Sequence, residues 1–256
     1  MLTARRSAIL QRTIVTVAVL GGVLLFLALS GPRNGWDFQR VWGRRGDADP
    51  LAVFLRALLL TLGISAGALL LALACGFLGG LARLSTRPWL HQLGSIYVEV
   101  VRGTPLLVQL FVAVYCVGYA LGVDEPLVVG VLTMGVFAGA YVAEIVRGAV
   151  QSIDPGQAEA ALSQGMTRWQ VLRLVLLPQA LRRMLPPLAG EFVSLVKDSS
   201  LLSAVGVLEI TKRAREFQAE TYRTFEVFLP LAATYLAITF PLSRLARRLE
   251  LRSAGP

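Results

Sequence analysis

Long apolar runs separated by short polar stretches dominate the chain. A transmembrane helix needs about 20 mostly apolar residues in succession, and several runs approach or exceed that length. The pattern therefore predicts an all-α membrane protein with six transmembrane helices, at residues 13–29, 51–82, 93–122, 126–148, 185–208 and 225–242.

The first run has a second interpretation. Arg5, Arg6 and Arg12 precede a short apolar stretch that ends at residue 29, and this is also the pattern of a cleaved signal peptide. We expect a retained helix, because multi-span proteins usually keep their first signal-like segment. With either interpretation, the residues after Ser30 are expected on the outer side.

Two other runs carry residues that modify an ordinary helix. The run 51–82 is rich in glycine and alanine, which lets neighbouring helices approach closely. The run 93–122 contains Thr104 and Pro105, and proline removes a backbone hydrogen bond. We expect close helix packing at the former and a kink at the latter.

Composition and charge support a membrane protein. Hydrophobic residues make up 55% of the chain and charged residues only 16%, whereas the net charge of +9 comes almost wholly from arginine. The basic residues flank apolar runs, so we expect a lipid surface as their partner and no nucleic acid. Cys75, Cys116 and His91 have no ligand spacing, so no metal site or disulfide is expected.

The distribution of arginine predicts the orientation. Basic residues are more frequent in the segments 1–12, 83–92, 147–183 and 243–252 than in the segments between them. Since cytoplasmic loops collect Lys and Arg, both termini are expected in the cytoplasm. The polar segment 154–178 is then cytoplasmic as well.

This segment has the residues that begin and end helices. Asp154 is a suitable N-cap before Pro155, and Gln157 is placed to complete a capping box. Gly165 is a suitable stop, and a second capping box of Thr167 and Gln170 opens a helix expected to end before Pro178. We expect two short helices joined at a glycine elbow. The first would present a small surface of Ala158, Ala160 and Ala161, and the second Trp169, Leu172 and Val175 or Leu176 on one side.

The residues alone leave three interpretations of this helix pair open. It is a surface segment among lipid head groups, a connector packed on the bundle, or a docking element for a cytoplasmic partner. A compact, well-capped pair is pre-organised for docking.

A resemblance adds to this interpretation. Glu159-Ala160-Ala161, three residues, Gly165, nine residues and then Val175-Leu176-Leu177-Pro178 resembles the EAA loop of ABC importer permeases, with valine in place of the usual isoleucine. In that family the short helix inserts into a groove of the ATP-hydrolysing subunit. The resemblance implies that Glu159, Ala160, Ala161 and Gly165 couple the chain to an ATPase.

Other stretches are similar to the amino-acid branch of that family. They are the segments 97–110, 139–161 and 195–210, the last with Ser199 where the family has threonine. The resemblance covers about 51–249, which implies a five-helix permease core at 51–250, an N-terminal segment with one extra helix at 1–50, and a short cytoplasmic tail at 251–256. It also implies a bacterial inner-membrane location and three partners: ATP-binding cassette ATPase subunits, a second permease of the same or a related chain, and an extracytoplasmic substrate-binding protein.

The chain has no P-loop. Such a loop needs Gly-Lys followed by Ser or Thr, whereas Lys197 follows valine and Lys212 follows threonine. We therefore expect no catalytic residues and no cofactor in this chain, with ATP bound by the partner subunit.

Charged residues inside apolar runs are costly and usually pair or line a pathway. Glu144 with Arg147, and Glu99 with Arg102, are each three residues apart, so we expect structural pairs within one helix.

Lys197 and Asp198 are adjacent and point about 100° apart on a helix, so each needs another partner. We expect Asp198 to pair with a basic or hydroxyl group on another helix or on the neighbouring permease. The residues expected to serve the substrate pathway or its gating are Lys197, Asp198, Ser199 and Thr104.

The preferred function is thus the permease subunit of an ATP-driven importer for polar amino acids. The alternative is an ion-coupled secondary transporter or channel, although such proteins often show inverted repeats and no convincing repeat relates the two halves. An intramembrane enzyme is disfavoured, because the sequence has neither HExxH nor GxSxG and only one histidine.

Overall fold

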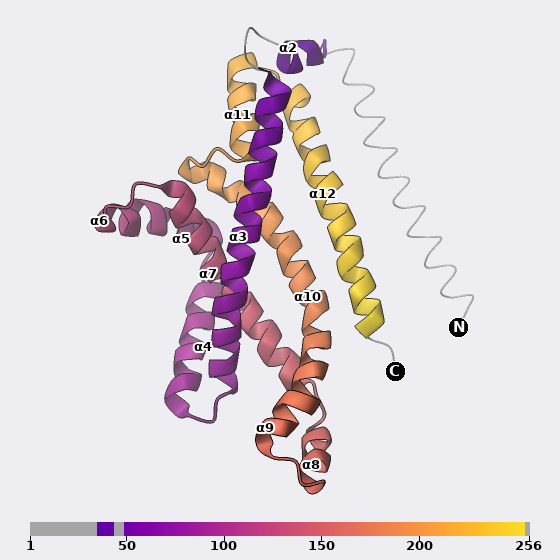
Figure 1. The fold of residues 1–256 in the computed structure, drawn as a ribbon. Helices are drawn as coiled ribbons and strands as arrows, with labels where there is room; N and C mark the ends of the chain where they lie inside the picture. The colour runs from indigo at the N-terminus through magenta and orange to yellow at the C-terminus, as the bar shows by residue number, and fades with distance from the viewer. Residues whose placement is uncertain (1–34, 44–48, 254–256) are drawn as a thin grey trace, which may run out of the picture.

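A computed structural model describes residues 35–43 and 49–253, and the described part of the chain is all-α (Figure 1). The first predicted span, at 13–29, and its alternative as a signal peptide lie outside these residues. In chain order the α-helices are α2 (Phe38–Trp42), α3 (Pro50–Leu84), α4 (Pro88–Arg102), α5 (Leu106–Phe111), α6 (Tyr119–Leu121), α7 (Pro126–Gln151), α8 (Pro155–Ser163), α9 (Arg168–Gln170), α10 (Leu177–Asp198), α11 (Ile210–Thr221) and α12 (Thr224–Ser253). Two π-helical turns, η1 (Val112–Gly118) and η2 (Val171–Leu176), and a 3₁₀ helix, η3 (Ser199–Val205), join some of them.

Three of the described helices, α3, α7 and α12, are long and apolar enough to cross a membrane. The bent pair formed by α4 and the segment Leu106–Leu121 raises this number to four if it is one span. These helices correspond to the predicted spans at 51–82, 93–122, 126–148 and 225–242.

The kink expected at Thr104 and Pro105 in the predicted span 93–122 is a complete break in the helix. The helix breaks between Arg102 and Leu106, and the two parts are bent by 99°. Pro105 has no N–H to continue the ladder and adopts an extended ψ of 137°, as residues at such a break do. The residues after the break therefore run across the bundle instead of along it (Figure 1).

The fifth predicted span, at 185–208, also differs from the structure. The helix begins earlier, because η2 and α10 run on through Pro178 in place of the expected stop. Next to the proline, the side chain of Gln179 donates a hydrogen bond to the Val175 carbonyl at 2.9 Å. At the other end α10 stops at Asp198, and the 3₁₀ helix η3 follows it to a left-handed Gly206.

The centre of the bundle is the contact between α3 and α7, which pack along most of their lengths. Glycines on α3 permit this approach. A Cβ on Gly76 would lie 2.4 Å from Val142, and one on Gly80 would lie 2.7 Å from Val146. Only glycine fits at both positions, because any larger side chain would clash with α7. This confirms the close helix packing that the small residues of this run predicted.

A second apolar cluster closes the end of the molecule that carries α2 and α11. The Trp42 ring meets Phe54 and Phe217 edge-on, and its Nε1 donates to the Glu226 carbonyl at 2.9 Å. This cluster ties α2 to α3, α11 and α12. The α8–α9 pair lies at the opposite end of the bundle (Figure 1).

Candidate functional site

The helix α8 begins at Asp154, as expected. The Asp154 side chain accepts a hydrogen bond from the Gly156 N–H at 2.7 Å, and Pro155 occupies the first turn. The expected capping box with Gln157 does not form, because the carboxylate caps Gly156, while the Gln157 N–H bonds the Asp154 carbonyl. The N-cap is therefore confirmed, whereas the capping box at this helix is wrong.

The elbow after α8 depends on Gly165. Its φ is +82°, a left-handed conformation that glycine adopts without strain. Its N–H bonds the Leu162 carbonyl at 2.9 Å, and the next N–H, of Met166, returns to the Ala161 carbonyl at 3.2 Å. These bonds satisfy carbonyls that the end of the helix would leave without donors.

The second short helix begins with the predicted capping box. The Thr167 N–H donates to the Gln170 side chain at 2.8 Å, and the Gln170 N–H donates to the Thr167 hydroxyl at 3.3 Å. The two helices therefore have a fixed relative geometry set by local bonds.

The exposed surface of this pair differs from the expected one. Glu159 and Ala160 are exposed, but Ala161 is only 6% exposed and packs inward. Trp169 is 65% exposed and Leu172 is 44% exposed. This end of the molecule thus exposes Glu159 and Ala160 together with apolar side chains that no described residue covers.

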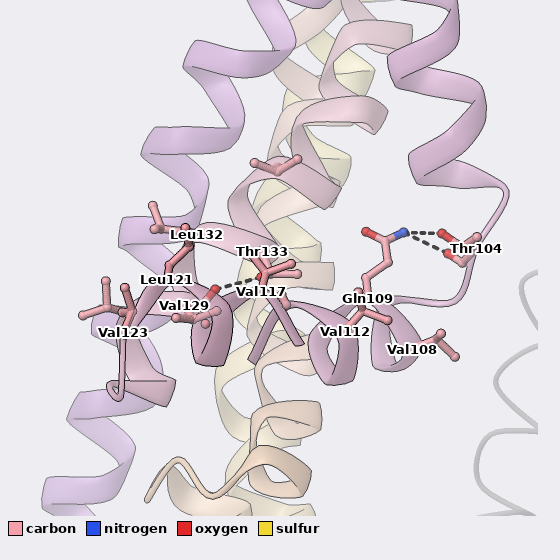
Figure 2. Close-up of a pocket in the computed structure, with 14 residues that line it drawn as sticks. Thr104, Val108, Gln109, Val112, Val117, Leu121, Val123, Val129, Leu132 and Thr133 are labelled. Carbon is pink, nitrogen blue, oxygen red and sulfur yellow. Dashed lines mark hydrogen bonds between the residues drawn. The ribbon is translucent and has the colours of Figure 1, made fainter. Parts of the chain in front are cut away.

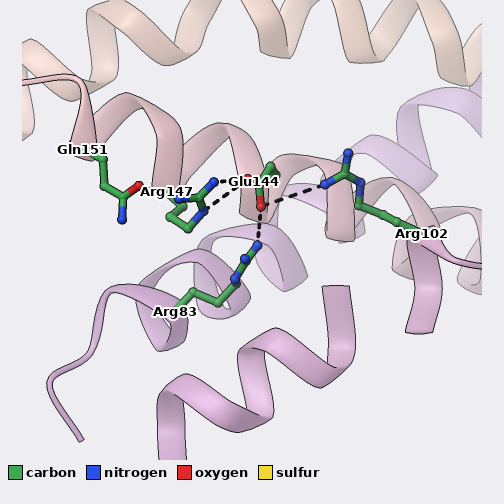
Figure 3. A network of polar contacts seen from close by, with 5 residues as sticks. All are labelled: Arg83, Arg102, Glu144, Arg147 and Gln151. Atoms are coloured by element: carbon green, nitrogen blue, oxygen red, sulfur yellow. Dashed lines mark hydrogen bonds and ion pairs between the residues drawn. The ribbon is translucent and has the colours of Figure 1, made fainter. Parts of the chain in front are cut away.

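The charges near α7 form one cluster, in which Glu144 is the centre (Figure 3). It pairs with Arg147 on its own helix, as expected, and with Arg83 of α3. Arg102 of α4 lies 3.9 Å away from it and stacks over the Tyr141 ring. One carboxylate therefore joins arginines from three helices.

The expected pair between Glu99 and Arg102 is wrong. In the described structure Arg102 turns toward Glu144, and Glu99 is exposed without an ion pair. The spacing of three residues permits a pair, but the Arg102 guanidinium instead stacks over the Tyr141 ring of α7, beside Glu144.

A cavity of about 330 Å³ lies beside α10. It is lined by Glu191, Ser194, Lys197 and Asp198 of α10, by Phe137 and Tyr141 of α7, and by Leu106 of α5. Among the described residues, its charged groups have no ion-pair partner within 4 Å, in contrast to Glu144. The expected partner of Asp198 on another helix is therefore not found within the described chain, and a partner on a neighbouring permease stays a prediction.

The four residues expected to serve the pathway are only partly brought together. Lys197 and Asp198 line this cavity, whereas Ser199 is fully buried and its hydroxyl donates to the Val196 carbonyl at 2.8 Å. Thr104 lines a different hollow of about 560 Å³ between the α5–α6 segment and α7, which is almost wholly apolar (Figure 2). There the Gln109 amide donates to the Thr104 hydroxyl at 2.7 Å.

Sequence reasoning assigned no site role to Ser194 and Tyr141. The spacing of Glu191, Ser194 and Asp198 carries a signal, because residues three or four apart share one face of a helix. No comparable signal exists for Tyr141, since it comes from α7.

Comparisons with known proteins agree with this geometry. Residues 68–254 match the family described as the inner membrane component of binding-protein-dependent transport systems. The chain is 39% identical to the glutamine transport system permease protein GlnP of Escherichia coli K12 over 85% of this chain and 97% of that protein. It is 35% identical to the probable glutamine ABC transporter permease protein GlnP of Bacillus subtilis 168 over 79% of this chain and 94% of that protein.

Solved structures show the same fold. A crystal structure of an amino acid ABC transporter with histidines matches with a TM-score of 0.74 and 37% identity, over 79% of this chain and 94% of the other. An inward-facing MetNI methionine ABC transporter matches with a TM-score of 0.64 and 23% identity, over 77% of this chain and 96% of the other. At this identity the match supports the fold alone. The chain therefore belongs to the family of inner membrane components of binding-protein-dependent transport systems, the permease subunits of ABC transporters.

Proposed function

We propose that this permease carries a polar amino acid of the glutamine type, driven by ATP hydrolysis on a separate subunit. The observation that carries the proposal is the cavity beside α10, where two carboxylates and one ammonium lie without ion-pair partners among the described residues. A free amino acid has one ammonium and one carboxylate, so it offers the complementary charges. The cavity volume of about 330 Å³ also falls in the range of small-molecule sites.

In this proposal Glu191 and Asp198 accept hydrogen bonds from the substrate ammonium, and Lys197 donates to its carboxylate. Tyr141 and Ser194 supply hydroxyls for a polar side chain. Charged groups in a membrane helix are costly unless a partner or a polar ligand offsets the lost hydration. Substrate binding would supply that partner during transport.

The α8–α9 elbow is proposed to dock on the ATPase. The family resemblance of Glu159, Ala160 and Gly165, together with the exposed Trp169 at this end, supports that assignment. A pair of helices fixed by local caps loses little freedom on docking. Motion of the ATPase subunits would then pass to α10 through η2, because the helix is continuous from Arg168 to Asp198.

The remaining partners follow from this orientation. We propose that the α8–α9 end and both termini lie in the cytoplasm, and that the external binding protein docks at the α2–α11 end. A second permease subunit would complete the transport path.

The test is uptake into proteoliposomes that contain this permease, its ATPase and its binding protein. Labelled glutamine should accumulate only when ATP is supplied to the ATPase side. Uptake that needs an ion gradient and ignores ATP would favour the secondary-transporter alternative.

A matched pair of glycine variants tests the coupling role of the elbow. A Cβ meets nothing within 4 Å at either Gly165 or Gly148, but only Gly165 has a positive φ. Gly165→Leu strains the elbow by about 1 kcal/mol or more and places a bulky side chain at the docking surface, so substrate-stimulated ATPase activity should fall several-fold. Gly148→Leu should keep it. Normal stimulation in a folded Gly165→Leu complex would contradict the coupling role.

A further inference from the structure

A second groove, of about 670 Å³, lies on another face of α10, against α12. Small side chains leave this space open: Gly190 on α10 faces Ser243 and Ala246 on α12, and a Cβ on Gly190 would meet nothing within 4 Å. Ser194 and Lys197 line both this groove and the cavity proposed for the substrate, whereas the other residues that line the groove take no part in the proposed transport function.

The charges of the groove are predominantly positive. Arg183, Lys197 and Arg247 line it, against the single carboxylate of Glu250. Within the described residues, Arg247 has no ion-pair partner within 4 Å. Arg183 donates through one nitrogen to the Ser152 hydroxyl at 2.8 Å, which holds the guanidinium in place and leaves its other donors available.

The groove divides into a basic end and an apolar middle. Lys197 lies 14 residues beyond Arg183, or about 21 Å along the helix, so an anion at Arg183 does not reach it. Pro186, Pro187 and Val193 line the stretch between them. At the basic end lie Arg183 of α10 and Arg247 of α12, and Ser243, one turn earlier on α12, also lines the groove.

The position of Arg247 indicates the kind of anion. It lies at the end of the apolar stretch of α12, which is long enough to cross a membrane, and this is the depth at which lipid head groups lie. Guanidinium groups bind phosphate oxygens through paired hydrogen bonds. Basic pockets between membrane helices on the cytoplasmic side are suited to anionic head groups.

We propose that this groove binds one anionic phospholipid, with its phosphate at Arg247 and Arg183 and an acyl chain along Pro187, Gly190 and Val193. Glu250 lowers the positive charge without cancelling it, so the site holds a singly charged phosphodiester rather than a polyanion. The lipid bridges α10 and α12 at the place where small residues leave them apart.

The test is lipid retention by the assembled transporter, measured by native mass spectrometry after exchange into phosphatidylglycerol or phosphatidylcholine. The wild-type complex should retain phosphatidylglycerol preferentially. Arg247→Gln should lower that retention about fivefold, the effect of one basic side chain near an anionic lipid. Arg248→Gln is the matched control, because Arg248 is exposed on the same helix and does not line the groove.

A second variant tests the same groove without a change of charge, so that the result does not depend on whether Arg247→Gln folds correctly. Gly190→Leu fills the groove in open space and should also lower retention. Equal retention in Arg247→Gln and Arg248→Gln, or in the two lipids, would overturn the proposal. Displacement of the lipid by millimolar inorganic phosphate would assign a free-anion site instead, and an altered subunit count in Arg247→Gln would assign the groove to the neighbouring permease.

Discussion

The charges around Glu144 and those around Asp198 lie in the same helical bundle but have opposite surroundings. Glu144 contacts Arg83 and Arg147 and has Arg102 at 3.9 Å (Figure 3). Asp198 shares a cavity with Glu191 and Lys197, and no ion pair joins them within the described chain.

This difference separates a structural from a functional use of charge. A carboxylate among apolar helices is stable when several donors compensate its lost hydration. The Glu144 cluster meets that condition inside one chain, so its role is to hold α3, α4 and α7 together. The charges along α10 do not meet it, so they require water, a neighbouring subunit or a substrate.

Glu209 is a third case and supports the comparison. Its side chain is fully buried between η3 and α11, yet it accepts hydrogen bonds from the N–H groups of Thr211 at 2.9 Å and Lys212 at 2.7 Å. It also lies 3.3 Å from the Tyr235 hydroxyl. This acid is satisfied by the start of α11, and its role is structural.

The largest expected effect on stability is at Glu144. Glu144→Gln leaves three arginines without their shared counter-charge and should lower the free energy of unfolding by about 2 kcal/mol. This is less than the ~3–5 kcal/mol of a fully buried pair, because the side chain is still 29% exposed. Thermal unfolding of the purified protein measures the change. Glu99→Gln is the control, since Glu99 is exposed and unpaired among the described residues; an equal loss there would refute the comparison.

A smaller effect, visible as a pH dependence, is expected at Glu209. Burial raises the pKa of its carboxyl above the ordinary value of 4.5, against the opposing hydrogen bonds from Thr211 and Lys212. The folded protein then holds this proton at a pH where the unfolded chain has lost it. Its contribution to stability is therefore fully present below pH 4.5 and falls as the pH rises through the raised pKa.

Glu209→Gln removes this titration. The variant should show a shallower decrease of its unfolding temperature with rising pH, because the amide does not titrate. Unfolding curves at a series of pH values measure it. An unchanged slope would mean that another group causes the pH dependence.

The sequence predicted the features that depend on local patterns. Hydropathy located α3, α7 and α12, and the three-residue spacing predicted the pair of Glu144 and Arg147. The sequence also predicted the helix caps at Asp154 and Thr167 and the elbow at Gly165, because each depends on hydrogen bonds within a few residues.

The features that depend on tertiary contacts were not predictable in this way. Arg102 pairs with Glu144, 42 positions away, which no spacing rule on one helix indicates. Pro105 marked the place of a break but not its 99° angle, which depends on how the following helix packs. Pro178 suggested a stop, whereas the π-helical turn η2 leads directly into α10, which holds Pro178 in its first turn.

The most direct test of the comparison is Asp198→Asn, which keeps the size of the side chain and removes its charge. We expect the complex with its ATPase to assemble normally and ATP-driven amino-acid uptake to fall about tenfold, equivalent to ~1.4 kcal/mol. Uptake and assembly are measured on the same preparation, so that a loss of transport is separated from a loss of protein. Full uptake at unchanged apparent affinity would contradict a transport role for the α10 charges, and loss of the assembled complex would make Asp198 a structural residue like Glu144.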